Sequence, residues 1–172
     1  MAQLTPDPDD SALTWLNNAD AETARDAVLR CCSAPSWADA VTKGRPYRSL
    51  DDLLNTSDDA MSDLTEDDIE QAIAGHPRIG DNTGGGSWSR QEQSGTANAS
   101  DAVRAELASG NTAYEERFGR VFLICATGLS AEQLLARLHA RLGNDAETER
   151  AVVREELRKI NRLRLERLVL RS

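Results

Sequence analysis

The chain has 172 residues, a net charge of −9 and 40% hydrophobic residues, and only 4% of its residues are aromatic. This length is enough to bury one hydrophobic core, built here mainly from aliphatic side chains. The acidic balance excludes proteins that bind nucleic acid through a broad basic face.

Residues 1–10 are rich in proline and aspartate and are predicted to form a disordered tail, which leaves residues 11–172 as a single domain. The polar start does not fit a signal peptide, and no run reaches the roughly 18 apolar residues of a membrane span. Three cysteines do not make a disulfide framework, and two histidines without metal-ligand spacing predict no metal site. We therefore expect a cytoplasmic protein that binds neither membranes nor nucleic acid.

Apolar residues at three-to-four spacing predict the helices of the first half of the chain. A long run from Ala12 to Ser33 contains Asp20, a suitable N-cap that divides the run into two helices. Three short helices are predicted to follow, over residues 36–41, 49–55 and 65–74. Gly75 is expected to end the last of them.

Residues 80–87 are dense in glycine and predict a loop. A long helix is expected over 99–118, with Val103, Leu107, Ala113 and Tyr114 on its buried side, and Gly110 is expected to weaken its middle. Residues 121–126 form a short apolar run that fits either a buried strand or the end of that helix. Helices over 130–142, with Ser130 as N-cap, and over 146–170 complete the pattern, which predicts an all-α, single irregular bundle of about eight or nine helices.

His76 lies in the sequence Gly75-His76-Pro77-Arg78-Ile79-Gly80. Pro77 disfavours helical geometry at the residue before it, so the imidazole should project from the end of a helix. Histidine can donate or accept a proton near neutral pH, which makes His76 a candidate general acid–base. The alternative is a helix-ending turn with an exposed histidine.

A second polar motif follows the glycine-rich stretch and contains Ser89, Glu92 and Gln93. Ser89 and Glu92 fit a helix capping box. They could instead, with Gln93, supply hydrogen bonds to a small ligand. In the last helix, Arg164 is predicted beside an apolar stripe of Ile160, Leu163 and Leu168, where it could hold a carboxylate.

Cys125, in an apolar run, is predicted to be a buried structural thiol, and His139 a surface residue.

These motifs are individually weak, but their order and spacing are more specific. Taken together, they resemble the 2-oxo-4-hydroxy-4-carboxy-5-ureidoimidazoline (OHCU) decarboxylase family over about residues 11–170. The matched stretches run from Pro35-Ser36-Trp37 and Arg45-Pro46-Tyr47 through the His76 and Ser89 motifs to Asn111-Thr112-Ala113-Tyr114, Arg141-Leu142-Gly143-Asn144 and the segment around Arg164.

The resemblance implies an all-α homodimer without metal or organic cofactor that converts OHCU to (S)-allantoin, the third step of urate degradation. It implies His76 as the catalytic histidine and Glu92 as a contact of the substrate, and we expect Glu92 to be a second catalytic group that accepts the substrate hydroxyl. The implied contacts of this small ureide substrate are Pro77, Ser89, Gln93, Phe118, Val121, Phe122, Ile124 and Arg164.

The sequence differs from the family pattern at one place among the implied substrate contacts. Many members read Phe-Gly-Phe-Pro-Phe where this chain has Phe118-Gly119-Arg120-Val121-Phe122, and the absent proline frees a backbone N–H at Val121. This departure keeps open the alternative of a related lyase with a different small ureide substrate. A non-enzymatic helical adaptor is a separate alternative.

Overall fold

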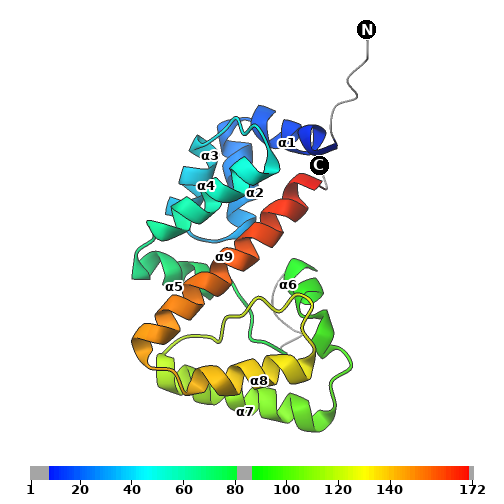
Figure 1. The fold of residues 1–172 in the computed structure, drawn as a ribbon, viewed down its shortest axis with the longest axis vertical. Helices are drawn as coiled ribbons and strands as arrows, with labels where there is room; N and C mark the ends of the chain where they lie inside the picture. Colours follow the sequence, from blue (N-terminus) through cyan, green and yellow to red (C-terminus); the bar gives the residue numbers. More distant parts are fainter. Residues whose placement is uncertain (1–7, 81–86, 171–172) are drawn as a thin grey trace. The chain divides into compact units, whose positions relative to one another are not determined.

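The computed structural model describes residues 8–80 and 87–170, with side chains described for 13–80 and 90–170. Their regular structure is entirely helical, with no strand in this part of the chain, which confirms the all-α prediction (Figure 1). No helix in the described ranges is both long and apolar enough to cross a bilayer. The elements are α1 (Pro8–Asn18), α2 (Ala21–Cys31), α3 (Pro35–Lys43), α4 (Leu50–Ser62), α5 (Glu66–Ala74), α6 (Ser87–Glu92), a 3-10 turn η1 (Ser94–Thr96), α7 (Asp101–Phe118), α8 (Ala131–Leu142) and α9 (Ala146–Leu170).

The predicted tail and glycine-rich loop fall partly outside the described residues. Residues 1–7 and 81–86 are not among them, whereas residues 8–10 of the predicted tail belong to α1.

The chain forms two compact units, which are described separately. The first unit contains residues up to Ile69 together with those from Arg158 onwards. The second unit runs from Glu70 to Leu157. The boundaries between them fall within α5 and α9.

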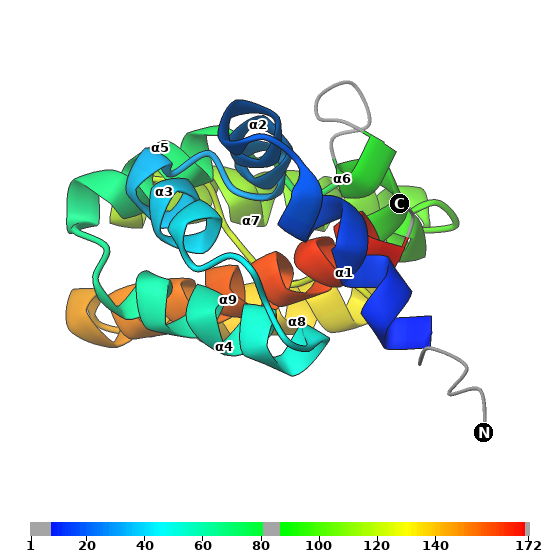
Figure 2. The ribbon, with the colours of Figure 1, turned by 90° about the horizontal axis from the view of Figure 1, so that it is seen from above.

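In the first unit, α3 packs against both α2 and α4 (Figure 2). Trp37 of α3 is fully buried, and its indole Nε1 donates to Ser57 Oγ of α4 at 3.2 Å. Arg45 donates to the carbonyl groups of Leu16 and Ala19, so it satisfies orphan acceptors at the end of α1. The Trp37 and Arg45 motifs of the resemblance thus have structural roles here.

The structure extends α4 to Ser62, beyond its predicted end at Asn55. Residues 55–59 are Asn, Thr, Ser, Asp and Asp, which have weak helix propensity and led to the short prediction. Buried contacts of Ser57, Ala60 and Met61 overcome this local preference.

In the second unit, α7 packs along α8, and a buried apolar cluster joins them to Ile79 and to the segment after α7. The buried face of α7 includes Leu107 and Tyr114 as predicted, but Ala113 is exposed. Gly110 is buried in place of Ala113. The α8 helix approaches it so closely that a Cβ at this position would lie 2.5 Å from Leu138 Cδ2. Gly110 therefore serves close helix packing rather than weakening α7.

Residues 121–126 belong neither to a strand nor to α7. The helix ends at Gly119, whose φ of +72° is in the left-handed region and whose N–H donates to Glu115 O at 2.8 Å. The apolar run that follows has no regular secondary structure and pairs with no strand in the described residues. Its backbone groups must therefore bond to side chains or water.

The start of α9 gives a pH-dependent prediction. Asp145 Oδ1 accepts from Thr148 N at 2.7 Å, and the backbone and side-chain hydrogen bonds from Thr148 lower the pKa of the Asp145 carboxyl. Because the folded-state pKa is lowered, this stabilisation is present above about pH 4 and is lost as pH falls through the folded-state pKa. We expect Asp145→Ala to lower the Tm at pH 7 by about 2–4 °C, and by less at pH 3, in thermal melts followed by circular dichroism.

Asp145→Asn is the matched control, because it keeps an oxygen acceptor without a titrating group. Its Tm at pH 7 should stay near the wild-type value. An Asp145→Ala deficit that is equally large at pH 3 would contradict this account.

Candidate active site

His76 follows directly after α5, as its neighbours predict. The last turn of that helix tightens, because Gly75 N donates to Ala72 O at 3.4 Å and His76 N donates to Ile73 O at 2.8 Å. His76 and Pro77 are both half-buried. The imidazole therefore extends from a helix terminus.

Three contacts fix the turn that carries His76. The Ile79 side chain is buried in the core of the second unit, and its carbonyl accepts from Asn111 Nδ2 at 2.9 Å. Gly80 adopts a φ of +86°, which favours glycine, and its N–H donates to Gln93 Oε1 at 2.9 Å. The last bond joins the histidine motif directly to the Glu92–Gln93 motif.

Glu92 and Gln93 lie where α6 passes into η1. Glu92 is buried, at 8% exposed, and Thr96 Oγ1 donates to Gln93 O at 2.9 Å. The capping-box interpretation is wrong, because α6 begins at Ser87, so that Ser89 is not its N-cap. The predicted substrate contact of the Ser89 side chain lies outside the described residues.

Close backbone packing holds η1 in place. A Cβ on Gly95 would overlap the carbonyl oxygen of Leu129, which precedes α8. Because that neighbour is backbone, it cannot turn aside as a flexible side chain would. Glycine at this position therefore fixes η1, and with it Glu92 and Gln93, against the loop before α8.

The Gly80 contact limits what Gln93 can do chemically. Its amide oxygen accepts the backbone N–H, so the opposite end of the amide carries the two N–H donors. Gln93 is therefore suited to donate to a ligand carbonyl.

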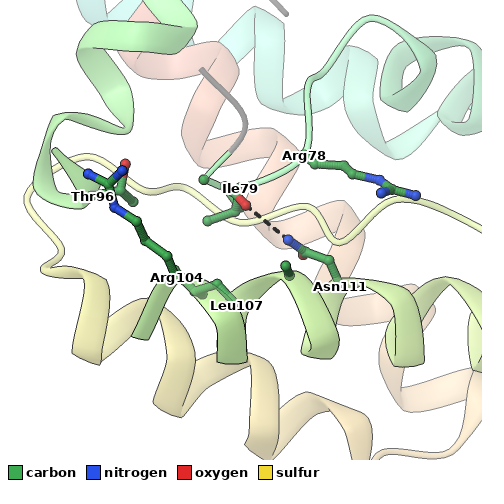
Figure 3. A pocket seen from close by; sticks show the side chains of 8 residues that line it. Arg78, Ile79, Thr96, Arg104, Leu107 and Asn111 are labelled. Atoms are coloured by element: carbon green, nitrogen blue, oxygen red, sulfur yellow. Dashed lines mark hydrogen bonds between the residues drawn. The ribbon is translucent and has the colours of Figure 1, made fainter. Parts of the chain in front are cut away.

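A cavity of about 220 Å³ lies on the α7 side of the same turn (Figure 3). Arg104 reaches along it toward Thr96, and the dashed bond between Asn111 and the Ile79 carbonyl borders it. His76, Glu92 and Gln93, all among the described residues, do not line this cavity. Its walls are formed by Arg78, Ile79, Gly80, Thr96, Arg104, Leu107, Ala108 and Asn111.

The predicted contacts of the segment after α7 differ in burial. Phe122 and Ile124 are buried in the core of the second unit, whereas Phe118 and Val121 are half-buried. The Phe118 ring lies 4.7 Å from the Tyr114 ring, centroid to centroid. Core burial commits the Phe122 and Ile124 side chains to packing, so the backbone is the part of these residues suited to a ligand.

Arg120, at the departure from the family pattern, belongs to the second unit and is 14% exposed in its side chain. Its Nε lies 3.5 Å from Glu70 Oε1, and Nε and Nη1 have no hydrogen-bond partner among the described residues. The substitution thus places a guanidinium near α5.

Arg164 belongs to the first unit, where it is 6% exposed and its Nη1 donates to Cys31 O at 3.1 Å. The predicted apolar stripe beside it was only partly correct, because Leu163 and Leu168 are half-buried. The buried face of this part of α9 has Arg164 at its centre rather than at its edge. It consists of Ile160, Asn161, Arg164, Leu165 and Val169.

The cysteine prediction needs one correction. Cys31 and Cys32 are buried free thiols, whereas Cys125 is only half-buried. Burial raises the pKa of the Cys32 thiol, which opposes a nucleophilic role. His139 is exposed, as predicted.

Sequence reasoning assigned no role to a buried polar network in the second unit. Glu149 Oε1 accepts from Tyr114 Oη at 2.5 Å and from Arg141, and Glu149 Oε2 accepts from Asn144 Nδ2 at 3.0 Å. Arg141 Nη1 also donates to Leu123 O at 2.6 Å. The one sequence feature that pointed to this network was the Arg141–Asn144 stretch, which is part of the family resemblance but had no role assigned to it.

Comparisons with known proteins agree with these features. The family model described as OHCU decarboxylase matches residues 17–166. A protein of Amia calva named 2-oxo-4-hydroxy-4-carboxy-5-ureidoimidazoline decarboxylase is 35% identical over 156 residues, which cover 86% of this chain and 86% of that protein. The uric acid degradation bifunctional protein TTL of Arabidopsis thaliana is 30% identical over 155 residues, which cover 86% of this chain and 48% of that protein.

A solved structure is similar as well. It is described as OHCU decarboxylase in the presence of (S)-allantoin, and it matches with a TM-score of 0.75 and 28% sequence identity. The match covers 84% of this chain and 97% of that one.

Proposed function

Because the chain belongs to the OHCU decarboxylase family, we propose that it decarboxylates OHCU to (S)-allantoin in urate degradation. The observation that carries the proposal is the hydrogen bond from Gly80 N to Gln93 Oε1. It brings the turn of His76 and the Glu92–Gln93 pair together in one unit of the fold. The family name is that of an enzyme, so the adaptor alternative is not retained.

The substrate suits a reaction without an organic cofactor. Its carbon that carries the leaving carboxylate also carries a hydroxyl and adjoins a ring C=N bond. When the bond to the carboxylate breaks, its electron pair can move into that C=N bond while CO2 leaves. The substrate thus provides its own electron sink, a task that a cofactor performs in many decarboxylases.

The protein must then hold the substrate and move two protons. We assign Glu92 to accept the proton of the substrate hydroxyl and His76 to act as general acid–base. Gln93, through its N–H donors, orients the carbonyl and ureido groups of the substrate. Pro77, Ser89 and the backbone of residues 118–124 form further contacts, and the final protonation on one face of the ring sets the S configuration.

The experiment is to add the protein to freshly generated OHCU and to follow the chirality of the product by circular dichroism. (S)-allantoin forming faster than in buffer supports the proposal. Racemic product at the spontaneous rate would overturn it. A related lyase acting on another ureide would also give only the spontaneous rate here.

Substitution of Glu92 tests whether its carboxylate accepts the proton of the substrate hydroxyl. We expect Glu92→Gln to lower kcat by about 10²-fold or more, because an amide cannot accept the proton, with a smaller change in KM. Initial rates at several substrate concentrations measure both. Glu116→Gln, at an exposed position of α7, should keep wild-type kinetics, and wild-type kcat in Glu92→Gln would refute the assigned role.

The resemblance also implies a homodimer, and we propose that the protein acts as one in the cytoplasm. Among the side chains that the structure describes, the first unit exposes two large apolar ones, Trp15 at 37% and Leu170 at 63%, as an interface would use. Sedimentation equilibrium should give about twice the chain mass of 18.8 kDa. A single-chain mass at micromolar concentration would contradict the dimer.

A further inference from the structure

One face of α7 contacts both of the backbone segments that the proposed function uses in the second unit. Asn111 and Tyr114 are three residues apart, so they lie on the same side of the helix, and both are buried. Asn111 holds the carbonyl of Ile79 in the turn of His76. Tyr114 donates to the Glu149 carboxylate.

Glu149 is connected through Arg141 to the segment after α7. Its carboxylate binds Arg141, which donates to Leu123 O at 2.6 Å. The Arg141 guanidinium carbon also lies 4.6 Å from the centroid of the Phe122 ring, a cation–π distance. Arg141 thus holds residues 122 and 123 through charge, hydrogen bond and ring contact together.

The Tyr114 link persists across the working pH range. Burial raises the pKa of the Tyr114 hydroxyl above its ordinary value, and its bond to Glu149 raises it further. The hydroxyl therefore remains protonated and continues to donate. Two charged groups face Tyr114: the Glu149 carboxylate accepts from its hydroxyl, and the Arg141 guanidinium carbon lies 5.8 Å from its ring centroid.

The side chains of Arg141 and Glu156 form hydrogen bonds with backbone groups that a neighbouring strand would bind in a β-sheet. Residues 121–126 have no regular structure and no strand partner in the described chain, and Glu156 Oε2 accepts from Cys125 N at 3.2 Å. Arg141 and Glu156 therefore fix the neighbouring carbonyl and N–H of residues 123 and 125. The distance from this segment to the turn of His76 is set through α7.

We propose that Asn111 and Arg141 are positioning residues, which together hold the turn of His76 and the backbone of residues 121–125 at a fixed spacing. The inference rests on the proposed function. A proton must reach one face of the substrate ring, and errors of about 1 Å in such geometry can cost about 10²-fold in rate. Loss of either anchor lets the two segments shift without removing a catalytic group.

The test uses Asn111→Leu, which removes the donor at similar volume, and Arg141→Lys, which keeps the charge but not the forked geometry. Thr112→Ala and Arg137→Lys, at exposed neighbouring positions of α7 and α8, are the matched controls. For each protein, kcat, KM and the enantiomeric excess of allantoin are measured, with the spontaneous reaction subtracted. Circular dichroism gives the folded fraction at the assay temperature.

We expect both variants to lose about 10- to 100-fold in kcat per folded molecule and to give a lower excess of (S)-allantoin, with both controls unchanged. A purely structural role predicts activity that falls only with the folded fraction and a product that stays fully S, and that result would overturn the inference. If Arg141→Lys does not fold, Asn111→Leu alone decides by the same criteria. A wild-type protein without activity on OHCU would instead overturn the proposed function itself.

Discussion

Replacement of His76 by asparagine is expected to abolish the acceleration of (S)-allantoin formation while the protein stays folded. Asparagine cannot exchange a proton near neutral pH, and general acid–base catalysis by a positioned side chain contributes about 10²–10⁴-fold. Because His76 is half-buried at a helix end and bonds through its backbone to Ile73, the turn should survive the change. Product formation is followed by circular dichroism, and folding by the far-ultraviolet spectrum and the Tm.

The chain offers a matched control, since it contains two histidines. His139 is exposed in the last turn of α8, and His139→Asn should keep the wild-type rate. Near wild-type turnover in folded His76→Asn would refute the catalytic role of His76. If His76→Asn loses both its rate and its fold, Arg78→Ala separates the two effects. Arg78 lies in the same turn, and its replacement removes the ion pair with Glu115 of α7 but no proposed catalytic group.

The helices of this fold could be predicted where local chemistry decides their ends. Asp20 accepts from Thr23 N at 2.9 Å and Ser130 Oγ accepts from Gln133 N at 3.2 Å, as the two N-cap predictions indicated. The prediction was wrong where tertiary packing opposes propensity, as in α4 and at Gly110 in α7. Local sequence contains neither the burial of Met61 nor the nearby Leu138.

The sequence was enough to identify residues of the candidate site, but not the hydrogen bonds that these residues make. His76 and Gln93 were identified by motif, whereas the use of the Gln93 oxygen by Gly80 N depends on a positive φ that the sequence does not fix. Glu149 was missed altogether, because its partner Tyr114 is 35 positions away and a lone glutamate in an amphipathic helix is usually solvated. Such long-range polar bonds become visible only once the helices are packed.

The buried network around Glu149 predicts the largest loss of stability. Glu149 is 2% exposed, and Glu149→Leu would leave the Arg141 guanidinium, also buried, without its carboxylate, and the Tyr114 hydroxyl without its acceptor. Breaking a buried ion pair at one partner costs about 3–5 kcal/mol. Domains are stable by only about 5–15 kcal/mol, so we expect the free energy of unfolding in urea to fall by a large fraction.

The double variant Arg141→Met/Glu149→Leu decides whether charge or packing causes that loss. The double variant removes both charges of the pair, so neither is left buried without its partner. It should therefore be more stable than Glu149→Leu alone, with a coupling energy of about 1–3 kcal/mol. It should not recover fully, because the Leu123 carbonyl loses its donor. A double variant as unstable as the sum of the two single variants would show that Arg141 and Glu149 act independently, and it would remove the physical basis for their joint hold on residues 121–126.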